Sequence, residues 1–593
     1  MSSSTLTQRT DGVVSLLRQH GWLALAIVLI LIHSWFIDSF TVNIPYIDDY
    51  TFLLDCLHMQ YTGFSVSELL RVVFFPHGEH IIVFARLTVL LDYWLTGELN
   101  YRTLFFVGNL TLLATALLLT RTARQTGLSG WQILPLFGLL FQPQYYENTA
   151  TWAICALQHL PALFFTYWTF YLLTRSSDRS LIGSLPIGFL AVFSNGNGLA
   201  VLVVGAVLLT ISRRWSRLLV WVLFSILAVG LYYHQSRFFP PTPVSSNLFH
   251  PLRVLGDFLL MNGSMALLLT RSLFWLIVLG ALVTGVLTFA AGAILLSYTT
   301  GTIFDRPWLR RWSNLTGQWA APTNFASRPA ALALVGNYLY VVLTMAGIAL
   351  ARGQGWHYGF LQPRFIWFAT AGVATGYLLV MQWLKPVHRA RFGRLALITA
   401  ILFNGLAYWL TTDEVLNVRR SLLSDTHNWR DARRLITLPA YTRQYDQFYS
   451  DVLATAVGKH VYTLPPDPFN LTGGLVSVTT SDIVEKDSSA RLGERQHRYL
   501  LLAARSLPSD ASATAGLFLL LRSKQHTFVW PINQSRTKLA QFLMTGYAPP
   551  AQPFALIFAD LLPPDRYQIG LAFWTANQSK VVYCRQWLSI PPH

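Results

Sequence analysis

The feature that most constrains this chain is a series of long apolar runs that fills its first 411 residues. An α-helix needs about 20 consecutive apolar residues to cross the hydrocarbon core of a bilayer. Candidate spans lie near residues 22–40, 101–120, 131–146, 153–174, 181–193, 198–211, 218–235, 271–298, 331–350, 365–384 and 395–411. We therefore expect a polytopic α-helical membrane protein with about 11 transmembrane helices.

The composition excludes several other classes of protein. Of the 593 residues, 53% are hydrophobic and only 12% are charged, against roughly 25% charged residues in an ordinary soluble domain. Lys and Arg outnumber Asp and Glu by 44 to 27, a net charge of +17. In a soluble protein this excess would indicate nucleic-acid binding. Here most of the cations among the apolar runs stand in short loops, so we expect membrane lipids and no nucleic acid as partners.

The distribution of Lys and Arg predicts which side of the membrane each loop faces, because these residues concentrate on cytoplasmic loops. Alternate loops carry the basic clusters, which are Arg9 and Arg18; Arg121 and Arg124; Arg175 and Arg179; Arg213, Arg214 and Arg217; Arg306, Arg310, Arg311 and Arg328; and Lys385, Arg389, Arg391 and Arg394. This alternation places the N-terminus in the cytoplasm and the C-terminal part outside. A bacterial inner membrane with a periplasmic C-terminal domain fits best, although an endoplasmic-reticulum membrane would leave the same pattern.

The orientation depends on residues 80–96, which must lie on the outer membrane surface and not cross it. Glu79, Arg86 and Asp92 interrupt or border this apolar run and make it a poor span. If the segment did cross, every later basic cluster would change sides. We therefore expect outer-surface helices within the first outer loop, residues 41–100.

The composition changes after residue 411. Residues 412–459 mix charged and apolar residues at helical spacing and predict a helical connector. Residues 460–593 contain short apolar runs between Gly and Pro residues, which is typical of strands separated by turns. These runs are Leu475–Val478, Gly516–Leu521, Thr527–Trp530, Phe554–Phe558, Tyr567–Phe573 and Val581–Leu588. We expect a small antiparallel β domain with a sandwich-like architecture.

The first outer loop carries two adjacent carboxylates, Asp48 and Asp49, directly after the first span. Carboxylates at a bilayer edge are costly unless they are paired or functional. One interpretation is that they cap the helix that follows, where negative charge is favoured. The other is that they act as a general base, a metal ligand or both.

Further polar residues collect in the outer loops. His77, Glu79 and His80 form either an interfacial ion cluster or a weak metal-ligand pattern. Glu147 is the single acid of the second outer loop, among aromatic residues. A later outer loop breaks the charge rule with Arg352, His357 and Arg364. Arginines at this depth bind a lipid phosphate through paired hydrogen bonds or extend toward ordinary headgroups.

In layout, the first 411 residues resemble the GT-C fold glycosyltransferases, which use a polyprenyl-phosphate sugar as donor. The aminoarabinose transferases of lipid A and the protein O-mannosyltransferases are similar in arrangement. Their first outer loop begins with an acidic pair, usually Asp-Glu, and Asp48 stands at the first position while Asp49 replaces the Glu. Residues 76–80 replace a Lys-Pro-Pro-type segment without its Lys. Glu147 matches a second-loop acid by position.

The chain is more similar to a bacterial subset of membrane proteins with short motifs at corresponding places. These motifs are a Glu-His-Arg-like element, a Ser-Gly-Asn-Gly-like turn and a late pair of Arg-containing elements. Glu79-His80, residues 194–198 and Arg352 with residues 363–365 fit them loosely. Ile81 replaces the Arg that follows the His, and Arg86 is a possible substitute for it.

The resemblance implies a glycosyltransferase that inverts the anomeric centre on the non-cytoplasmic face. The sugar would pass from a polyprenyl-phosphate donor to a glycan, lipid or protein acceptor, with Asp48 as general base. Asp49 and Glu147 would orient the acceptor or hold a divalent metal cation, a cofactor that the family uses in some members only. The donor phosphate would be held by Arg352, Arg364 and either Arg86 or His357, and acceptor or metal contacts would come from Glu79, His77 and His80.

Two other functions are compatible with the same sequence. A transporter or flippase of lipid-linked sugars would also have many spans and interfacial arginines, but it would often show internal repeats and midplane charges, and neither is evident here. A noncatalytic membrane scaffold with a carbohydrate-binding β domain would not need its outer-loop acids to converge.

Overall fold

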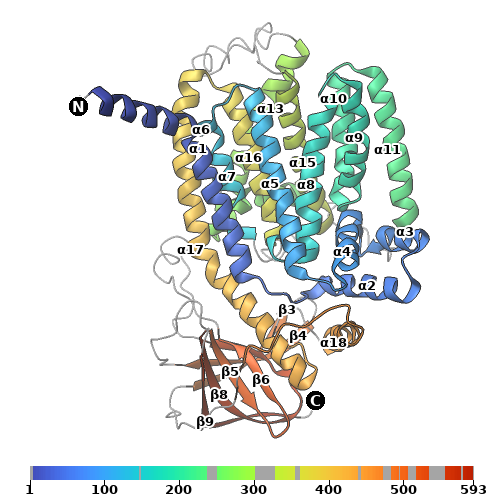
Figure 1. The fold of residues 1–593 in the computed structure, drawn as a ribbon, viewed down its shortest axis with the longest axis vertical. Coiled ribbons are helices and arrows are strands. Elements are labelled where there is room, and N and C mark those ends of the chain that lie inside the picture. The colour runs from blue at the N-terminus through green and yellow to red at the C-terminus, as the bar shows by residue number, and fades with distance from the viewer. Residues whose placement is uncertain are drawn as a thin grey trace. The chain divides into compact units, whose positions relative to one another are not determined.

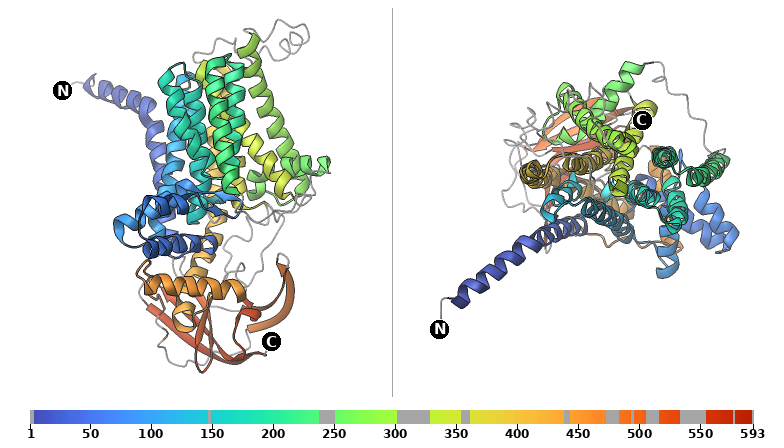
Figure 2. Two further views of the ribbon diagram at one scale, coloured as in Figure 1. Left: turned by 90° about the vertical axis from the view of Figure 1, so that its right-hand side faces the viewer. Right: turned by 90° about the horizontal axis from the view of Figure 1, so that it is seen from above.

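A computed structural model describes residues 4–145, 149–236, 250–300, 328–353, 361–437, 443–469, 471, 483–492, 495–504, 516–532, 554–575 and 578–591 (Figures 1 and 2). The chain forms two compact units. The helical unit comprises Met1–Asp38, Leu69–Thr88 and Leu104–Trp409, and the mixed unit comprises Ser39–Glu68, Val89–Thr103 and Leu410–His593. Residues of the first outer loop therefore contribute to both units.

Seven helices of the described chain are long and apolar enough to cross a membrane. They lie side by side in roughly one direction within the helical unit (Figures 1 and 2). Each corresponds to one of the spans expected from the sequence, and they are α1 (Ser4–Phe40), α5 (Tyr101–Gln125), α11 (Trp215–Ser236), α13 (Leu273–Thr300), α15 (Arg328–Arg352), α16 (Pro363–Trp383) and α17 (Pro386–Ala432).

The other four expected spans do not form helices of this kind among the described residues. The segment 131–146 is broken into the short helices α6 (Gly130–Ile133) and α7 (Pro135–Leu140), because Pro135 cannot donate a backbone hydrogen bond. The segments 181–193 and 198–211 fall within α9 (Asp178–Val192) and within η4 (Gly196–Leu199) plus α10 (Ala200–Ile211). These helices are shorter than the roughly 20 residues of an ordinary span. The predicted count of 11 crossings is therefore not confirmed.

The fourth of these segments, α8 (Ala153–Leu173), is long enough but contains Gln158, His159 and Pro161. Almost all of its side chains are buried within the protein. It packs against α9, α10 and α15. A Cβ at Gly108 of α5 would lie 2.7 Å from the Cβ of Ala156, so a glycine is required where α5 and α8 approach each other. α8 is an interior helix that can carry polar groups because protein surrounds it.

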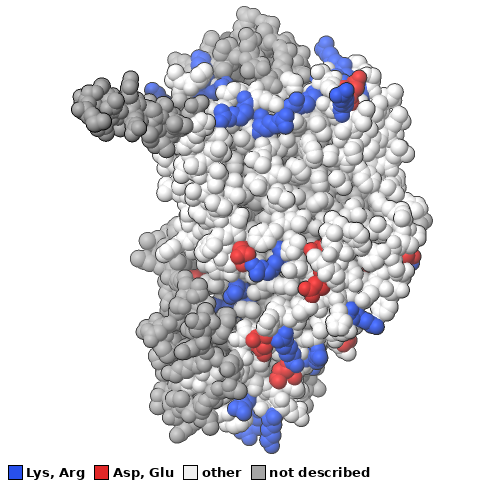
Figure 3. Space-filling model, in the orientation of Figure 1, with Lys and Arg blue, Asp and Glu red and all other residues white. Residues whose placement is uncertain are grey.

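One end of the helical unit is rich in arginine, as the blue residues across the upper part of Figure 3 show. Arg214 donates a hydrogen bond to the carbonyl oxygen of Leu173 at 3.2 Å, and Arg217 pairs with Asp178 at 2.7 Å. The guanidinium of Arg175 lies 4.1 Å from the centre of the Tyr171 ring. These contacts tie the α8–α9 and α10–α11 connections together. They belong to the loops expected to be cytoplasmic.

The first outer loop forms short helices and a small hairpin. They are η1 (Ile47–Asp49), α2 (Tyr50–Thr62), α3 (Val66–Phe74), β1 (Pro76–His77), β2 (His80–Ile81) and α4 (Val83–Thr96). The 14 residues of α4 are fewer than a span needs. In the mixed unit, α2 packs against α18 (Arg443–Gly458), and the N–H of Leu99 donates to the carbonyl of Val461 at 2.8 Å.

The C-terminal region contains two antiparallel sheets, as the sequence predicts. One has the order β3-β4-β7 and the other β6-β5-β8-β9. Their strands are β3 (Ile483–Leu492), β4 (Arg495–Ala504), β5 (Gly516–Arg522), β6 (Thr527–Pro531), β7 (Phe554–Phe558), β8 (Asp565–Thr575) and β9 (Gln578–Ile590). Five of the expected strands are present. The sixth, Leu475–Val478, lies outside the described residues, and β3 and β4 were not expected.

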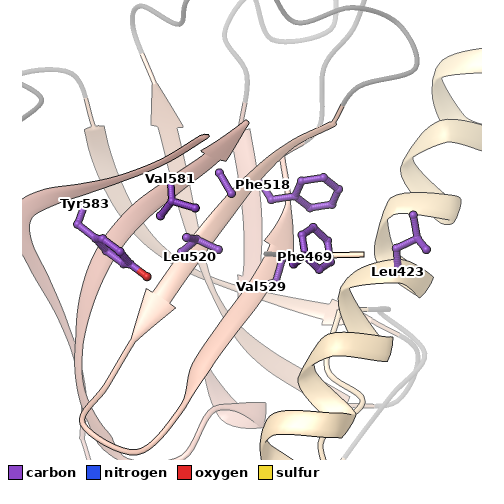
Figure 4. Close-up of a cluster of buried hydrophobic side chains, with 8 residues drawn as sticks. Leu423, Phe469, Phe518, Leu520, Val529, Val581 and Tyr583 are labelled. Atoms are coloured by element: carbon purple, nitrogen blue, oxygen red, sulfur yellow. The ribbon is translucent and has the colours of Figure 1, made fainter. Parts of the chain in front are cut away.

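The second sheet and α17 share a hydrophobic core (Figure 4). Phe518 and Leu520 of β5 and Val529 of β6 are fully buried there. Leu423 of α17 and Phe469 complete the cluster from the helix side, and the rings of Phe469 and Phe518 lie 4.8 Å apart. Every residue of β5 except Arg522 is buried, which explains its continuous apolar run.

The last apolar helix does not end at the expected boundary near residue 411. α17 is one helix of 47 residues, about 70 Å long at 1.5 Å per residue. A bilayer core accounts for only about 30 Å of this length. The predicted connector 412–459 is therefore helical, but its first half continues the last apolar helix and only α18 is a separate element.

Candidate functional site

The expected site residues fall into two groups in different units, and each group is described by itself. The acidic turn, Ile47 to Asp49, belongs to the mixed unit. The basic cluster, defined by His80, Arg352 and Arg364 with Glu79, belongs to the helical unit. Glu147 and His357 lie outside the described residues.

The acidic turn has a strained backbone. Ile47, directly before Asp48, has a φ angle of 44°. This left-handed conformation is unfavourable for a β-branched residue because its Cβ approaches the neighbouring carbonyl. Strain of this kind persists only where surrounding contacts hold it, and it is concentrated at functional sites.

The contacts of Asp49 stabilise this turn. Its side chain is completely buried, and its Oδ2 accepts a hydrogen bond from the backbone N–H of Tyr46 at 3.1 Å. The Asp49 carbonyl oxygen accepts a second bond, from the Tyr101 hydroxyl at 3.1 Å. The bond from Tyr46 belongs to a capping box of the η1 turn, in which Asp49 is the third residue. The interpretation that the acids cap the helix that follows is not met, because the Asp49 side chain makes no capping hydrogen bond to α2 among the described residues. The contacts within the turn leave Asp49 as a positioning residue for its neighbour.

Asp48 has a different environment. It is half-buried, and among the described residues its carboxylate makes no hydrogen bond or ion pair. Its charge does act on one neighbour in the same unit: burial raises the pKa of the Tyr449 phenol, and Asp48 raises it further. A carboxylate that is accessible, unpaired and rigidly presented meets the requirements of a general base better than Asp49 does.

The basic cluster is built around the β1–β2 hairpin. His77 and His80 are paired across the hairpin, and Gly78 takes the positive φ of 53° that the turn requires. The turn presents Glu79, whose Oε2 lies 3.0 Å from the guanidinium of Arg352 at the end of α15. Both side chains are about half exposed, at 49% and 41%. This pair is therefore accessible to a competing anion.

His80 is held in an enclosed position beside the η4 turn. A Cβ at Gly196 would lie 2.6 Å from its Nδ1, so only a glycine fits there. This nitrogen is buried and has no hydrogen-bond partner among the described residues. The pKa of His80 is lowered to about 4, chiefly by burial and then by the charge of Arg352. Glu79 opposes the shift, and His77 and Arg364 contribute to it. His80 is thus a neutral imidazole at pH 7.

Two arginines from different helices therefore act on one histidine. Arg352 ends α15 and Arg364 stands in the first turn of α16, where its guanidinium lies 5.3 Å from the centre of the Phe365 ring. Because α15 and α16 are both apolar helices of spanning length, this positive charge gathers at the ends of two apolar helices. Such positions suit the headgroup of a lipid.

Sequence reasoning missed the polar residues behind this cluster. His159 of α8 is 7% exposed, and its Nδ1 lies 2.8 Å from the side-chain nitrogen of Asn195. In the same turn, the side-chain amide of Asn197 is buried with no partner within the described part of the chain. The sequence predicts a turn at residues 194–198, which fits a Ser-Gly-Asn-Gly-like motif loosely. The signal that could have identified them is the combination of a polar His in an apolar helix with two Asn residues.

Arg86 is set apart from the other predicted phosphate ligands. It is 1% exposed, and its guanidinium donates to the carbonyl oxygens of Val72, at 3.0 Å, and of Phe75. Its Cζ also lies 5.8 Å from the centre of the Phe75 ring. These contacts fasten the end of α3 ahead of the hairpin. The structure thus gives Arg86 a positioning role next to the cluster.

A metal centre at His77, Glu79 and His80 finds no support in the structure. Among the described residues, no three side chains of His, Cys, Asp or Glu come close enough together to hold a metal ion. The described residues therefore provide no set of ligands for the divalent cation that the family resemblance allows.

The chain was compared with protein families, curated proteins and solved structures. No protein-family model matches it, and neither a curated protein nor a solved structure does. The similarity to GT-C glycosyltransferases therefore stays a prediction from the short motifs quoted above, and the structure itself shows a protein of apolar, membrane-type helices with a C-terminal antiparallel β region.

Proposed function

We propose that this protein is an integral-membrane glycosyltransferase of the GT-C type, which transfers a sugar from a polyprenyl-phosphate donor. The observation that carries the proposal is the convergence of Arg352 and Arg364 on the enclosed His80. A polyprenyl-phosphate sugar is a lipid whose phosphodiester carries a negative charge at the membrane surface. Arginines at the ends of two apolar helices provide matching charge-assisted hydrogen bonds.

The unpaired polar atoms beside the arginines support the same ligand. The side-chain amide of Asn197, in the turn against which His80 packs, is buried without a partner among the described residues. Buried polar atoms of folded proteins normally have a hydrogen-bond partner. Phosphate oxygens and sugar hydroxyls can supply such partners when the donor is bound.

The chemistry proposed for the acidic turn is the one that the family resemblance implies, and the half-buried Asp48 carboxylate supports it. The acceptor hydroxyl oxygen would attack the anomeric carbon of the sugar while Asp48 removes the hydroxyl proton. The bond between that carbon and the phosphate oxygen would break, and polyprenyl phosphate would leave with the electron pair and invert the anomeric centre. A general base typically contributes 10²–10⁴-fold to the rate. Asp49 would hold the turn, and Glu147 would orient the acceptor.

The orientation and the location belong to the same proposal. With the arginine-rich end of the helical unit in the cytoplasm, the N-terminus would lie inside and the C-terminal domain in the periplasm of a bacterial inner membrane. The donor would then lie in the outer leaflet. This side lacks nucleotide sugars, which is consistent with the use of a lipid-activated donor.

The test is release of polyprenyl phosphate by the full-length chain purified in detergent and incubated with a panel of polyprenyl-phosphate sugars and acceptors. We expect release by the parent chain and a loss of about 10²-fold or more in Asp48→Asn, with unchanged thermal unfolding. Equal release by both proteins would remove Asp48 from the mechanism. Absence of release, together with movement of lipid-linked sugars between vesicle leaflets, would favour the transporter alternative.

The Glu79–Arg352 pair allows a second test with effects of opposite sign. If Glu79 competes with the donor phosphate for Arg352, Glu79→Gln should lower KM for the donor and Arg352→Gln should raise it, each by about fivefold. Because the pair is half exposed, both variants should retain their stability to within about 1 kcal/mol. Arg71→Gln, on the exposed side of α3, is the matched control. A change of KM in the same direction in both variants would contradict phosphate binding at this pair.

A further inference from the structure

A row of aromatic rings lies in the mixed unit next to the acidic turn. The Tyr50 ring stacks on the Tyr449 ring with centres 4.4 Å apart and planes 23° apart. The Tyr449 ring is nearly parallel to that of Tyr445, at 5.9 Å and 17°. Tyr50 is 1% exposed, whereas Tyr445 is 52% exposed and the neighbouring Phe448 is 47% exposed. The row therefore begins inside the unit and ends at its surface.

Local sequence explains why the row forms. Tyr445 and Tyr449 are four residues apart in α18 and Phe448 is three from Tyr445, so these rings share one side of the helix. Tyr50 begins α2 directly after Asp49, and the packing of α2 against α18 brings it to Tyr449. The short link through Asp49 keeps Asp48 close to the row.

The charge of Asp48 reaches this row. Burial raises the pKa of the Tyr449 phenol, and Asp48 raises it further, so carboxylate and phenol lie close enough to interact. The carboxylate itself is half-buried and makes no hydrogen bond to any described residue. A flat aromatic surface is thus paired with an unused hydrogen-bond acceptor.

Packing alone accounts for only part of this arrangement. Burial of Tyr50 against Tyr449 stabilises the contact between α2 and α18. It does not account for Tyr445 and Phe448, which remain half exposed three residues apart on α18 and leave aromatic surface available to a ligand. A pyranose ring fits this surface: its C–H face can lie on the exposed Tyr445 ring at the end of the row while a hydroxyl donates to Asp48. A lipid chain has no donor for the carboxylate.

We propose that the row Tyr50–Tyr449–Tyr445 with Phe448 is the acceptor subsite, and that the acceptor is a carbohydrate. This inference rests on the proposed function, because it assigns the hydroxyl held beside Asp48 to the attacking sugar. It narrows the acceptor from a glycan, lipid or protein to a glycan. The β region is not required to touch the sugar.

The inference is tested by saturation-transfer NMR on the full-length chain in detergent micelles. The probes are the methyl glycosides of glucose, galactose, mannose and N-acetylglucosamine, each added alone. At least one should receive saturation on its C–H face. Tyr445→Ala and Phe448→Ala should each weaken its binding about fivefold, as the loss of one aromatic contact does. Tyr445→Phe should bind normally because it keeps the ring.

The control variant is Tyr61→Ala, which removes an exposed tyrosine of α2 that is not part of the row and should bind like the parent. All variants should unfold at the same temperature as the parent. Binding that is equal in Tyr445→Ala and the parent, or saturation of none of the four probes, would overturn the inference. Binding of lysine methyl ester in place of every glycoside would also overturn it, since the surface would then be a cation site.

The outcomes separate this inference from the proposed function. Tyr445-dependent glycoside binding without any polyprenyl-phosphate release would support the sugar subsite while the transferase assignment fails. Polyprenyl-phosphate release with an acceptor KM that is unchanged in Tyr445→Ala would support the transferase and remove the subsite.

Discussion

At the scale of single residues, the adjacent carboxylates Asp48 and Asp49 have different roles: Asp49 holds the turn, and Asp48 is the proposed general base. The two carboxylates are adjacent and chemically identical, yet Asp49 is completely buried and bonded to Tyr46 while Asp48 is half-buried. The strained Ile47 allows this difference, because a positive φ angle turns the chain sharply before the pair. Sequence alone leaves capping of the following helix and catalysis open as alternatives for both residues, and the structure places Asp49 in the capping box of the η1 turn.

His80 provides a prediction at the same scale. Its pKa is about 4 in the folded protein against the ordinary 6.5, so the unfolded chain binds more protons between these values. Titration of His80 therefore leaves the free energy of unfolding unchanged above pH 6.5. As the pH falls from 6.5 toward 4, protonation of the unfolded chain lowers the free energy of unfolding by at most about 3 kcal/mol. His80→Gln should remove this part of the pH dependence, measured as the thermal unfolding midpoint between pH 7 and pH 4. The exposed His460→Asn variant should retain it; an unchanged profile in His80→Gln would contradict burial of a neutral imidazole.

At the scale of elements, the C-terminal half of α17 completes the edge of a sheet. The side-chain amide of Asn428 donates to the carbonyl of Val529 at 2.9 Å, and its oxygen accepts the Val529 N–H at 2.7 Å. It thus pairs with the edge strand β6 as another strand would, and covers an edge that would otherwise invite aggregation. Next to it, His427 lies between the Asp467 carboxylate, at 2.7 Å, and the Thr527 carbonyl, at 3.0 Å.

The Asn428 contact predicts a large loss of stability on truncation. Asn428 and Val529 are both fully buried, so Asn428→Ala would leave a backbone donor and a backbone acceptor unpaired. We expect a loss of about 2–4 kcal/mol in the free energy of unfolding, measured by denaturant titration. Gln525→Ala, in the exposed turn between β5 and β6, should change stability by less than about 0.5 kcal/mol. A similar small effect of both substitutions would show that Asn428 does not complete the edge of the sheet.

At the scale of the whole molecule, the distribution of charge predicts the orientation in the membrane. The three cysteines are buried, so the native chain should react little with thiol reagents. Ser216→Cys lies in the first turn of α11, beside Arg214 and Arg217, and Lys524→Cys lies in the exposed turn between β5 and β6. In intact spheroplasts, a membrane-impermeant maleimide should label Lys524→Cys, and it should label Ser216→Cys only after permeabilisation. The reverse pattern would invert the proposed topology and with it the side on which the donor binds.

Elements that form through local sequence patterns could be predicted from the sequence, and elements that depend on distant partners could not. Seven apolar helices and five strands were predicted, because apolar composition and short apolar runs act locally. The strands β3 and β4 were not predicted. The residues of β3, 483–492, are mostly polar or charged, so β3 is stabilised by its pairing with β4 and not by an apolar run of its own. The shorter helices α9 and α10 leave the predicted count of 11 spans unconfirmed, because an apolar run has the same composition whether lipid or protein covers it.

The sequence by itself determined that this chain has membrane-type helices followed by a β region, because burial of apolar surface needs only composition and periodicity. It also identified Asp48, Glu79, Arg352 and Arg364 as polar residues at costly positions. Only the tertiary structure decided which of them meet. Glu79 pairs with Arg352 across 273 positions, and His80 lies against Gly196 from another helix connection. Such contacts depend on how helices pack, and no local pattern encodes that.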